Sequence, residues 1–512
     1  MNEEIKNNEC SIVNKTSEQH FKAKFPVFCV ATFVYAVLYA ICVYENPSGI
    51  GYGVYVVCSL IYIMFCFKEM ELPLKRENIF YIITIIALGV ATFCTDDWKI
   101  IFMNKVAIFI LTALFVLDSV FDTRKWKFCK YISSAVITTI MSIAEICEPF
   151  VNAYTYLKAR KNKQNYKLLY GVLGCVIAIP IVAFIFILLS SADIVFRECA
   201  INIFGDINIV DIIIMTIMFG FMFMASYCLM SYLSKRELNE TVKDNKKIEP
   251  LMVIPVTAML TILYIIFAGI QVVYLFIGKM KLPEGYTYSE YAREGFFQLL
   301  VVSVINLIIV LVCVGFAKSN KVLKGILTVM TLCTFVMIAS STARILTYMQ
   351  YYYLTFLRIF VLWSLLVLAC VFVGVLIYIY KDKFPIFKYV VMIVTYLYMA
   401  FAFSHPDYIV AKVNLGATEG KESQFFLGEG FDDYDFLAYL SADGATAVAQ
   451  WIDEQGYAYD IGKPYINHKY LFFYTPQEYG ENYMCMISEK TKDMGIKDFN
   501  FSRYTAKKLI KE

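Results

Sequence analysis

Apolar residues run through this chain in repeated stretches of about twenty, each with few charges. A stretch of that length crosses the roughly 30 Å hydrocarbon core of a bilayer as one α-helix. In lipid the backbone must satisfy its own hydrogen bonds, and the stretches lack the alternation of membrane strands. We predict transmembrane helices over 26–43, 50–67, 78–95, 100–121, 168–189, 209–233, 251–277, 294–317, 322–343, 356–380 and 385–403.

The composition supports a membrane protein. Hydrophobic residues make up 59% of the 512 residues, and the mean hydropathy is +0.61, whereas soluble domains are about 45–50% apolar. Most of the fifteen cysteines lie inside the apolar stretches and none has C-x-x-C spacing, so we do not expect a disulfide framework. Residues 1–25 are polar and contain no signal-peptide core, so the first helix would act as the insertion signal.

Lysine and arginine are unevenly divided between the connecting segments. One set comprises 1–25, 68–77, 122–167, 234–250, 318–321 and 381–384. This set holds 25 basic residues, whereas the alternate loops before residue 404 hold 6. Cytoplasmic loops carry the basic excess. We therefore predict a multi-pass protein of the plasma membrane with a cytoplasmic N-terminus and, after about eleven spans, an extracytoplasmic C-terminus.

The segment 131–157 does not fit the pattern of spans. Its apolar part, 131–144, is short, and Ser134, Thr138 and Ser142 form a polar stripe at a spacing of four residues. Basic clusters flank both ends, so a spanning helix would carry one cluster across the membrane. We favour an amphipathic helix lying on an anionic leaflet over a twelfth span or a re-entrant turn.

Polarity rises sharply at Ser404. Residues 404–512 contain 17 acidic and 11 basic residues, enough chain for one small domain. We predict helices at 434–441 and 446–454 and a strand at 470–474. The fold class is therefore an all-α polytopic membrane bundle with a small C-terminal α/β extracytoplasmic domain. Its parts are a polar N-terminus (1–25), a first helix group (26–121), a basic interfacial segment (122–167), a second helix group (168–403) and the C-terminal domain (404–512).

Familiar catalytic motifs are absent from the sequence. It contains no Walker A motif, G-x-S-x-G, H-E-x-x-H or G-x-G-x-x-G. The histidines His20, His405 and His468 are far apart in sequence, and we expect ordinary surface histidines rather than a metal site or a triad. We predict no catalytic residues, metal or cofactor and no nucleic-acid partner, and we favour a role other than catalysis.

Charged residues gather at the ends of three apolar stretches that the predicted topology places on the outer side. Such residues in a membrane protein often mark a binding site. The candidate ligand-binding residues are Asp193, Arg197, Glu290, Arg293, Glu294, Arg344 and Arg358. Guanidinium groups pair with phosphate or carboxylate, so an anionic lipid, an envelope polymer or an anionic solute would fit. The alternative, which is the commoner arrangement at helix ends, is that these carboxylates and Glu198 neutralise the arginines and lock the helices together.

The same segments resemble a known family. They read LLSSADIVF (188–196), IPVTAMLTILYIIFAGIQVVYLF (254–276), YSEYAREGFFQLL (288–300), SSTARILTYMQYYYLTFLRIFVLW (340–363), HPDYIVAKVNL (405–415) and DYDFLAYLSADGATAV (433–448). Together they resemble an uncharacterised bacterial family of multi-helix membrane proteins, domain of unknown function 4173, and its sister 4153, over roughly residues 165–450. His405 stands where the resemblance implies Asn, and Gly444-Ala445 stands where it implies Ala-Val-Pro. The resemblance implies the fold and no activity.

The sequence therefore predicts a membrane protein that binds an anionic ligand or an envelope partner at its outer face, in a sensory or assembly role. Two alternatives stay open. The number of helices would suit a transporter of a small solute or lipid. Asp193 or Glu294 as a base would suit an enzyme acting on lipid-linked substrates. The lipid bilayer is the one partner that the sequence specifies.

Overall fold

The computed structural model describes most of the chain. The described residues are 17–46, 48–72, 75–121, 128–159, 209–235, 248–273, 288–351, 353–418, 434–461, 463–466, 475–492 and 494–510, with a few more at 123, 126 and within 182–196. In these residues the regular elements are helices, and the only extended pairing is an isolated bridge between Ile248 and Ala317.

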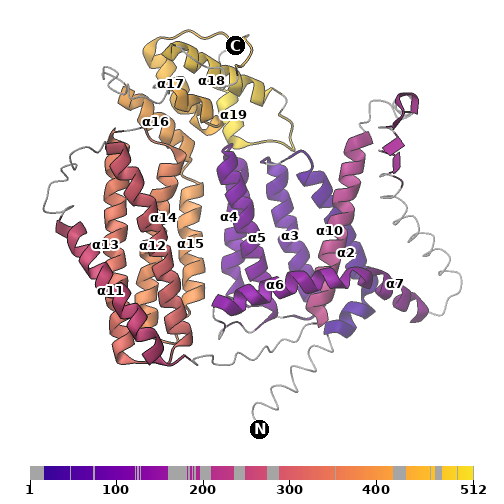
Figure 1. Ribbon diagram of the computed structural model, residues 1–512. Helices are drawn as coiled ribbons and strands as arrows, with labels where there is room; N and C mark the ends of the chain where they lie inside the picture. Colours follow the sequence, from indigo (N-terminus) through magenta and orange to yellow (C-terminus); the bar gives the residue numbers. More distant parts are fainter. Residues whose placement is uncertain are drawn as a thin grey trace.

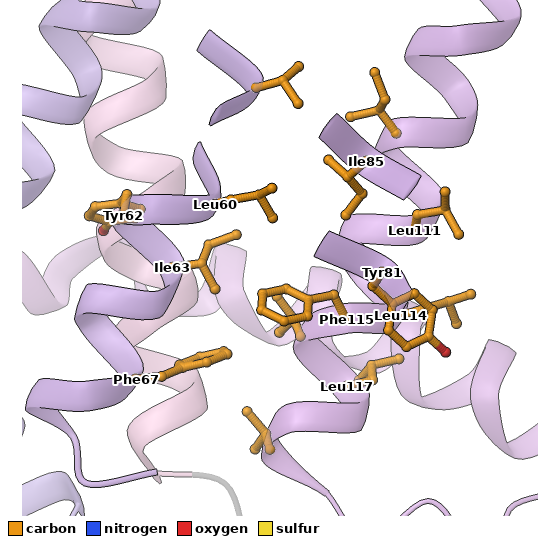
Figure 2. Close-up of a cluster of buried hydrophobic side chains, with 14 of the residues drawn as sticks. Leu60, Tyr62, Ile63, Phe67, Tyr81, Ile85, Leu111, Leu114, Phe115 and Leu117 are labelled. Atoms are coloured by element: carbon orange, nitrogen blue, oxygen red, sulfur yellow. The ribbon is translucent and has the colours of Figure 1, made fainter. Parts of the chain in front are cut away.

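The first helix group packs around large apolar side chains. It contains α2 (Phe25–Val43), α3 (Ile50–Glu69), α4 (Asn78–Cys94), α5 (Trp98–Val120) and α10 (Ile209–Lys235). Figure 2 shows Leu60 and Ile63 of α3 pointing toward Phe115 of α5, whereas Tyr62 points the other way. The Tyr62 hydroxyl lies 2.9 Å from Thr32 Oγ1 on α2, so α3 contacts neighbours on both sides.

The second helix group is built from five further helices. They are α11 (Pro250–Val272), α12 (Tyr288–Phe316), α13 (Lys321–Tyr351), α14 (Phe356–Tyr380) and α15 (Ile386–Ala402). Antiparallel α12 and α13 are tied by Asn306 Nδ2, which donates to Thr334 Oγ1 at 3.0 Å. The two groups meet along α15, where the Tyr398 hydroxyl donates to Asn104 Oδ1 of α5 at 2.7 Å.

The helices confirm a polytopic membrane protein. Nine described helices are long and apolar enough to cross a membrane, or up to ten if α15 and the helix after it count as one bent span. The sequence predicted about eleven. The predicted span 78–95 corresponds to the shorter apolar helix α4, and the predicted span 168–189 lies almost entirely outside the described residues.

The C-terminal region forms a helical cap over the ends of both helix groups (Figure 1). The cap comprises α16 (Pro406–Thr418), η4 (Asp435–Tyr439), η5 (Ala442–Gly444), α17 (Ala445–Gln455), α18 (Pro476–Thr491) and α19 (Phe501–Lys507). Its core includes Val448, Trp451 and Ile487. We call the end of the helices that carries the cap the cap end, and the other the opposite end.

The predicted α/β character of the C-terminal domain is wrong for the described residues, whose regular elements there are all helices. The helix predicted at 446–454 is α17, but residues 435–439 form only the 3-10 turn η4. The predicted strand 470–474 lies outside the described residues. Directly after it, Thr475 and Glu478 form a capping box and Pro476 occupies the first turn, so the chain begins α18.

A separate helical segment runs across the first helix group near the opposite end (Figure 1). It consists of α6 (Phe128–Ala144), η2 (Glu145–Cys147) and α7 (Glu148–Ala159), and we call it the crossing segment. It contacts α10 along much of its length and touches α5 and α2 at its two ends. Its position relative to the bilayer stays a prediction.

Candidate functional site

Four buried carboxylates lie where the cap meets the first helix group. They belong to Asp96 and Asp97 in the turn between α4 and α5, Asp407 at the start of α16, and Asp443 in η5. Their side chains are between 0 and 3% exposed. We call these four residues the carboxylate cluster. Ionised groups buried this deeply require compensating partners.

Two turns about 350 residues apart in sequence are joined by hydrogen bonds from backbone N–H groups of each turn to a carboxylate of the other. The Asp96 N–H donates to Asp443 Oδ1 at 2.8 Å, and the Ala442 N–H donates to Asp96 Oδ2 at 3.1 Å. Thr95 Oγ1 also donates to Asp443 Oδ2 at 2.5 Å. The exchange is reciprocal, so neither turn keeps this hydrogen bonding without the other.

Capping residues in the local sequence hold these two turns in place. Asp97 is the N-cap of α5, where its side chain accepts the Lys99 N–H at 2.9 Å. Ser441 caps η5 in the same way, and its N–H donates to Asp407 Oδ2 at 2.9 Å. The Asp97 side chain is engaged at the N-terminus of α5, whereas the side chain of the preceding Asp96 is directed toward α18 and α19 of the cap.

Three cations face the carboxylate cluster. Arg503 Nε of α19 lies 2.6 Å from Asp96 Oδ1, and Lys490 Nζ of α18 lies 3.1 Å from Asp96 Oδ2. Lys99 Nζ lies 3.4 Å from Asp97 Oδ1 and 3.7 Å from Asp407 Oδ1. The carboxylates of these pairs are buried, whereas the three cations are 25–42% exposed, so the pairs are charge-assisted but partly open to solvent.

His405 supplies a fourth, titratable partner. Its Nδ1 lies 3.2 Å from Asp443 Oδ2. The residue has a φ of 48° and stands at the 52° bend between α15 and α16. Left-handed backbone disfavours most side chains and tolerates Asn and His better. The family resemblance implies Asn at this position, and the left-handed conformation gives a physical reason for it.

The surroundings shift the pKa values of three of these groups. Burial raises the pKa of Asp97, and the nearby charge of Asp407 raises it further, against the opposing effect of Lys99. Burial also acts to raise the pKa of Asp443, but hydrogen bonds from His405 and other donors outweigh it, so the pKa falls below its ordinary value. The hydrogen bond to Asp443 raises the pKa of His405 despite partial burial.

The carboxylate cluster holds the cap, and its net charge depends on the protonation of His405 and of the carboxyl groups. Four carboxylates face three permanent cations, so the charges balance when His405 is protonated or one carboxyl is neutral. Within the described chain, no group of three His, Cys, Asp or Glu side chains is arranged to hold a metal ion. The carboxylates are instead engaged by backbone, hydroxyl and cationic donors from the cap and the helices.

The sequence did not single out the carboxylate cluster as a site. His405 was expected to be an ordinary surface histidine, whereas its side chain is 35% exposed and bound to a fully buried carboxylate. One signal was available in the sequence. Asp96 and Asp97 are adjacent acidic residues in a very short connection between two apolar stretches, where the chain leaves them little distance from the membrane helices.

Two of the predicted binding residues lie at the cap end of the second helix group. Arg344 on α13 is 9% exposed, and its Nη2 donates to Gln271 Oε1 of α11 at 3.3 Å. Gln271 Oε1 also accepts from Ser340 Oγ at 2.7 Å. Arg358 on α14 places its guanidinium carbon 4.2 Å from the centre of the Tyr348 ring, which is a cation–π contact.

The other predicted residues are less fully placed. Glu290, Arg293 and Glu294 lie in the first turns of α12, although their side chains are outside the description. Because α12 and α13 are antiparallel and Asn306 pairs with Thr334, those turns run at about the level of Arg344. Asp193 is exposed and accepts the Val195 N–H of its own turn at 2.8 Å. Arg197 and Glu198 lie outside the described residues.

The apolar helices define the class: this is a polytopic α-helical integral membrane protein. The family described as "Domain of unknown function (DUF4153)" matches residues 82–450, and the chain belongs to it. This is the sister family named in the resemblance, and membership of 4173 itself is not shown. No curated protein and no solved structure matches the chain. The matched region includes the carboxylate cluster and ends before Lys490 and Arg503.

Proposed function

We propose that the protein is a membrane receptor that binds an anionic group at the cap end of its second helix group. Arg344 and Arg358 would hold the anion, and the cap would respond to it. The two arginines project from consecutive helices joined by a short connection at that end. Guanidinium groups provide two parallel donors, which match a phosphate or carboxylate.

The observation that carries the proposal is a contact between this connection and the cap. Leu354 lies between the helices that carry Arg344 and Arg358, and its N–H donates to Asn414 Oδ1 of α16 at 2.8 Å. The Asn414 amide nitrogen donates back to the Leu354 carbonyl at 2.9 Å. A shift of the arginine-bearing helices would therefore reach α16, which begins beside the carboxylate cluster.

The ligand is expected to be an anionic lipid headgroup or a free phosphate, because both present the same phosphate oxygens to the arginines. We would reconstitute the protein in nanodiscs of phosphatidylcholine and measure binding of short-chain phosphatidylglycerol and, separately, of inorganic phosphate. Selective binding of the lipid would identify a headgroup site, and equal binding of both would identify a phosphate site.

Arg344→Gln and Arg358→Gln should each weaken that binding by about tenfold or more, since a hydrogen bond to a charged group contributes about 1.5–3 kcal/mol. The matched control is Lys412→Gln, which removes an exposed cation of α16 at the same end and should leave binding unchanged. Folded arginine variants that bind like the wild type would overturn the proposal and leave the arginines a structural role.

A further inference from the structure

Both ends of the crossing segment contact the same end of the helix bundle. The Tyr131 hydroxyl donates to Asp118 Oδ1 at 3.2 Å in the last turn of α5, and the Tyr131 ring stacks on Phe387 at the start of α15, with centroids 3.9 Å apart. Near the other end, the Tyr156 ring lies 5.8 Å from that of Phe25, the first residue of α2. All three partners are at the opposite end from the cap.

The segment is long and apolar enough to span a membrane, but the contacts of its two ends show that it does not cross the helix bundle from one end to the other. Residues 130–156 meet the length and hydropathy of a span, and a crossing helix would place its two ends on opposite faces of the bilayer. Figure 1 shows it running across the upright helices instead. Glu145, at its middle, is held by Lys235 in the last turn of α10, which is also at the opposite end.

Its polar stripe faces the protein and its apolar face is exposed. Ser134, Thr138 and Ser142 are at most 8% exposed. The exposed apolar residues of α6 are Phe128, Ile132, Val136, Ile137, Ile140, Met141 and Ile143. A helix floating on a membrane surface would turn its polar side to water. This orientation is the reverse, and it leaves a broad hydrophobic surface on the outside of the molecule.

The polar groups on the outward side are satisfied within the helix. The hydroxyls of Ser133, Thr139 and Thr155 donate to the carbonyls of residues three or four positions earlier, at 3.1, 3.0 and 2.7 Å. These hydroxyls therefore do not require water as a partner, which is compatible with a lipid environment. The two acidic residues, Glu145 and Glu148, each lie 2.5 Å from Lys235 Nζ. No charged side chain remains unpaired between Lys130 and Lys158.

We infer that the crossing segment is embedded lengthwise in the leaflet at the opposite end, with lipid acyl chains against its apolar face. Lys130 and Lys158 bracket it, and the adjacent sequence is rich in lysine and arginine, so its ends fit the anionic headgroups of that leaflet. Packing against a second copy would favour small residues, whereas this surface presents large branched side chains such as Ile132, Ile140 and Ile143.

The test is photocrosslinking in liposomes of phosphatidylcholine and phosphatidylglycerol. The residue p-benzoylphenylalanine replaces Ile140, which is 60% exposed. Val30, on the exposed side of α2, is the lipid-facing reference, and Ser319, in the turn between α12 and α13, is the aqueous reference. Each variant must give the size-exclusion elution profile and the helical circular dichroism of the wild type.

We expect lipid adducts at Ile140 with a yield similar to that at Val30 and at least about tenfold above that at Ser319. A crosslinked dimer at Ile140 would replace the lipid with a second copy and overturn the inference. A yield as low as that at Ser319 would place the face in water and overturn it as well. Because the arginine site lies at the cap end, neither result depends on the proposed receptor function.

Discussion

Asp96 is the member of the carboxylate cluster that pairs with two cations of the cap. It accepts from Arg503, Lys490 and the Ala442 N–H. Replacing Asp96 removes the buried charge that both cations share, and the Ala442 N–H beside it loses a charged acceptor. Asp96 is therefore where a single substitution should separate the cap from the helices.

Asp96→Asn should destabilise the docked cap by about 1.5–3 kcal/mol, the usual contribution of hydrogen bonds to a charged group, because Arg503 and Lys490 are 26 and 42% exposed and regain water when released. The readout is limited proteolysis of the cap at increasing temperature, together with the thermal unfolding midpoint in detergent. Glu489→Gln, which neutralises an exposed residue of α18, is the matched control and should change neither. Equal protease resistance in the two variants would contradict the role assigned to Asp96.

The titration of His405 and Asp97 predicts how cap docking depends on pH. Folding raises the pKa of His405 above 6.5, so its contribution is complete below that value and is lost as the pH rises through the folded pKa. Folding raises the pKa of Asp97 above 3.8, so ionising it at higher pH also costs stability. The lowered pKa of Asp443 acts only at more acidic pH.

The thermal unfolding midpoint should accordingly decrease as the pH is raised from 5 to 8. His405→Gln should flatten this dependence in part, because Asp97 still titrates, and a double variant with Asp97→Asn should flatten it further. Differential scanning fluorimetry across the pH series measures both. A wild-type midpoint that rises with pH, or a slope unchanged in His405→Gln, would show that these groups do not govern docking.

Much of this site was beyond prediction from the sequence because it is assembled over very long separations. The Asp96–Asp443 hydrogen bond joins residues 347 positions apart. The positions of the candidate binding residues were easier to predict, since charged groups beside apolar stretches stand out, and their binding role stays a prediction. Arg344 and Arg358 do lie at one end of one helix group, although nothing in the sequence indicated that Gln271 and Tyr348 would be their neighbours.

At the scale of elements, the spans were predictable because length and hydropathy determine them directly. The predicted ranges 50–67 and 356–380 correspond closely to α3 and α14. The cap was less predictable. Its helices are short and polar, and their limits depend on capping by residues such as Thr475 and Asn500 rather than on a long apolar period. The polar stripe of α6 was recognised correctly, but a stripe alone does not specify whether it faces water or protein.

The cap also depends on a close approach of two backbones. Gly49 lies at the N-terminus of α3. A Cβ added at this position would lie 2.6 Å from the Lys497 carbonyl oxygen and 2.7 Å from Asp498 Cα. Beside it, the Ile50 N–H donates to the Phe499 carbonyl at 2.8 Å. The contact is made by main-chain atoms, which cannot rotate out of the way as a side chain would.

Gly49→Ala should therefore loosen the segment before α19 and destabilise the docked cap by about 1–3 kcal/mol, as overpacking usually does. Gly416→Ala is the control, because a Cβ at that exposed helical position would meet nothing within 4 Å. Hydrogen exchange of residues 494–500 measures the effect locally. Unchanged protection in Gly49→Ala would mean that the two segments separate easily without cost.

At the scale of the whole molecule, the cap joins two helix groups that otherwise meet along one seam. Asn500 Nδ2 donates to the carbonyls of Ser48 and Thr95 in the first group, at 3.0 and 2.8 Å. Asn414 holds Leu354 of the second group. Movement of one group against the other would have to strain or release these contacts, which makes the cap the element best placed to report such movement.

The side of the membrane on which the cap lies decides whether that report concerns the cell exterior. The excess of lysine and arginine belongs to the connections at the opposite end, including the turn at 318–321. The cap should then be extracytoplasmic. Ile496, which is 92% exposed in the cap, and Ser319, which is exposed in that turn, are suitable positions for testing this.

We expect a membrane-impermeant maleimide to label Ile496→Cys in intact cells well above the wild-type background, and Ser319→Cys only after permeabilisation. Both positions are outside the apolar stretches, so an added thiol there should not disturb packing. The reverse pattern would place the cap in the cytoplasm, in contact with cytosolic rather than envelope ligands, and the arginines of the cap end would then face the inner leaflet. Labelling at both sites without permeabilisation would show that the cells were leaky and require spheroplasts of defined orientation.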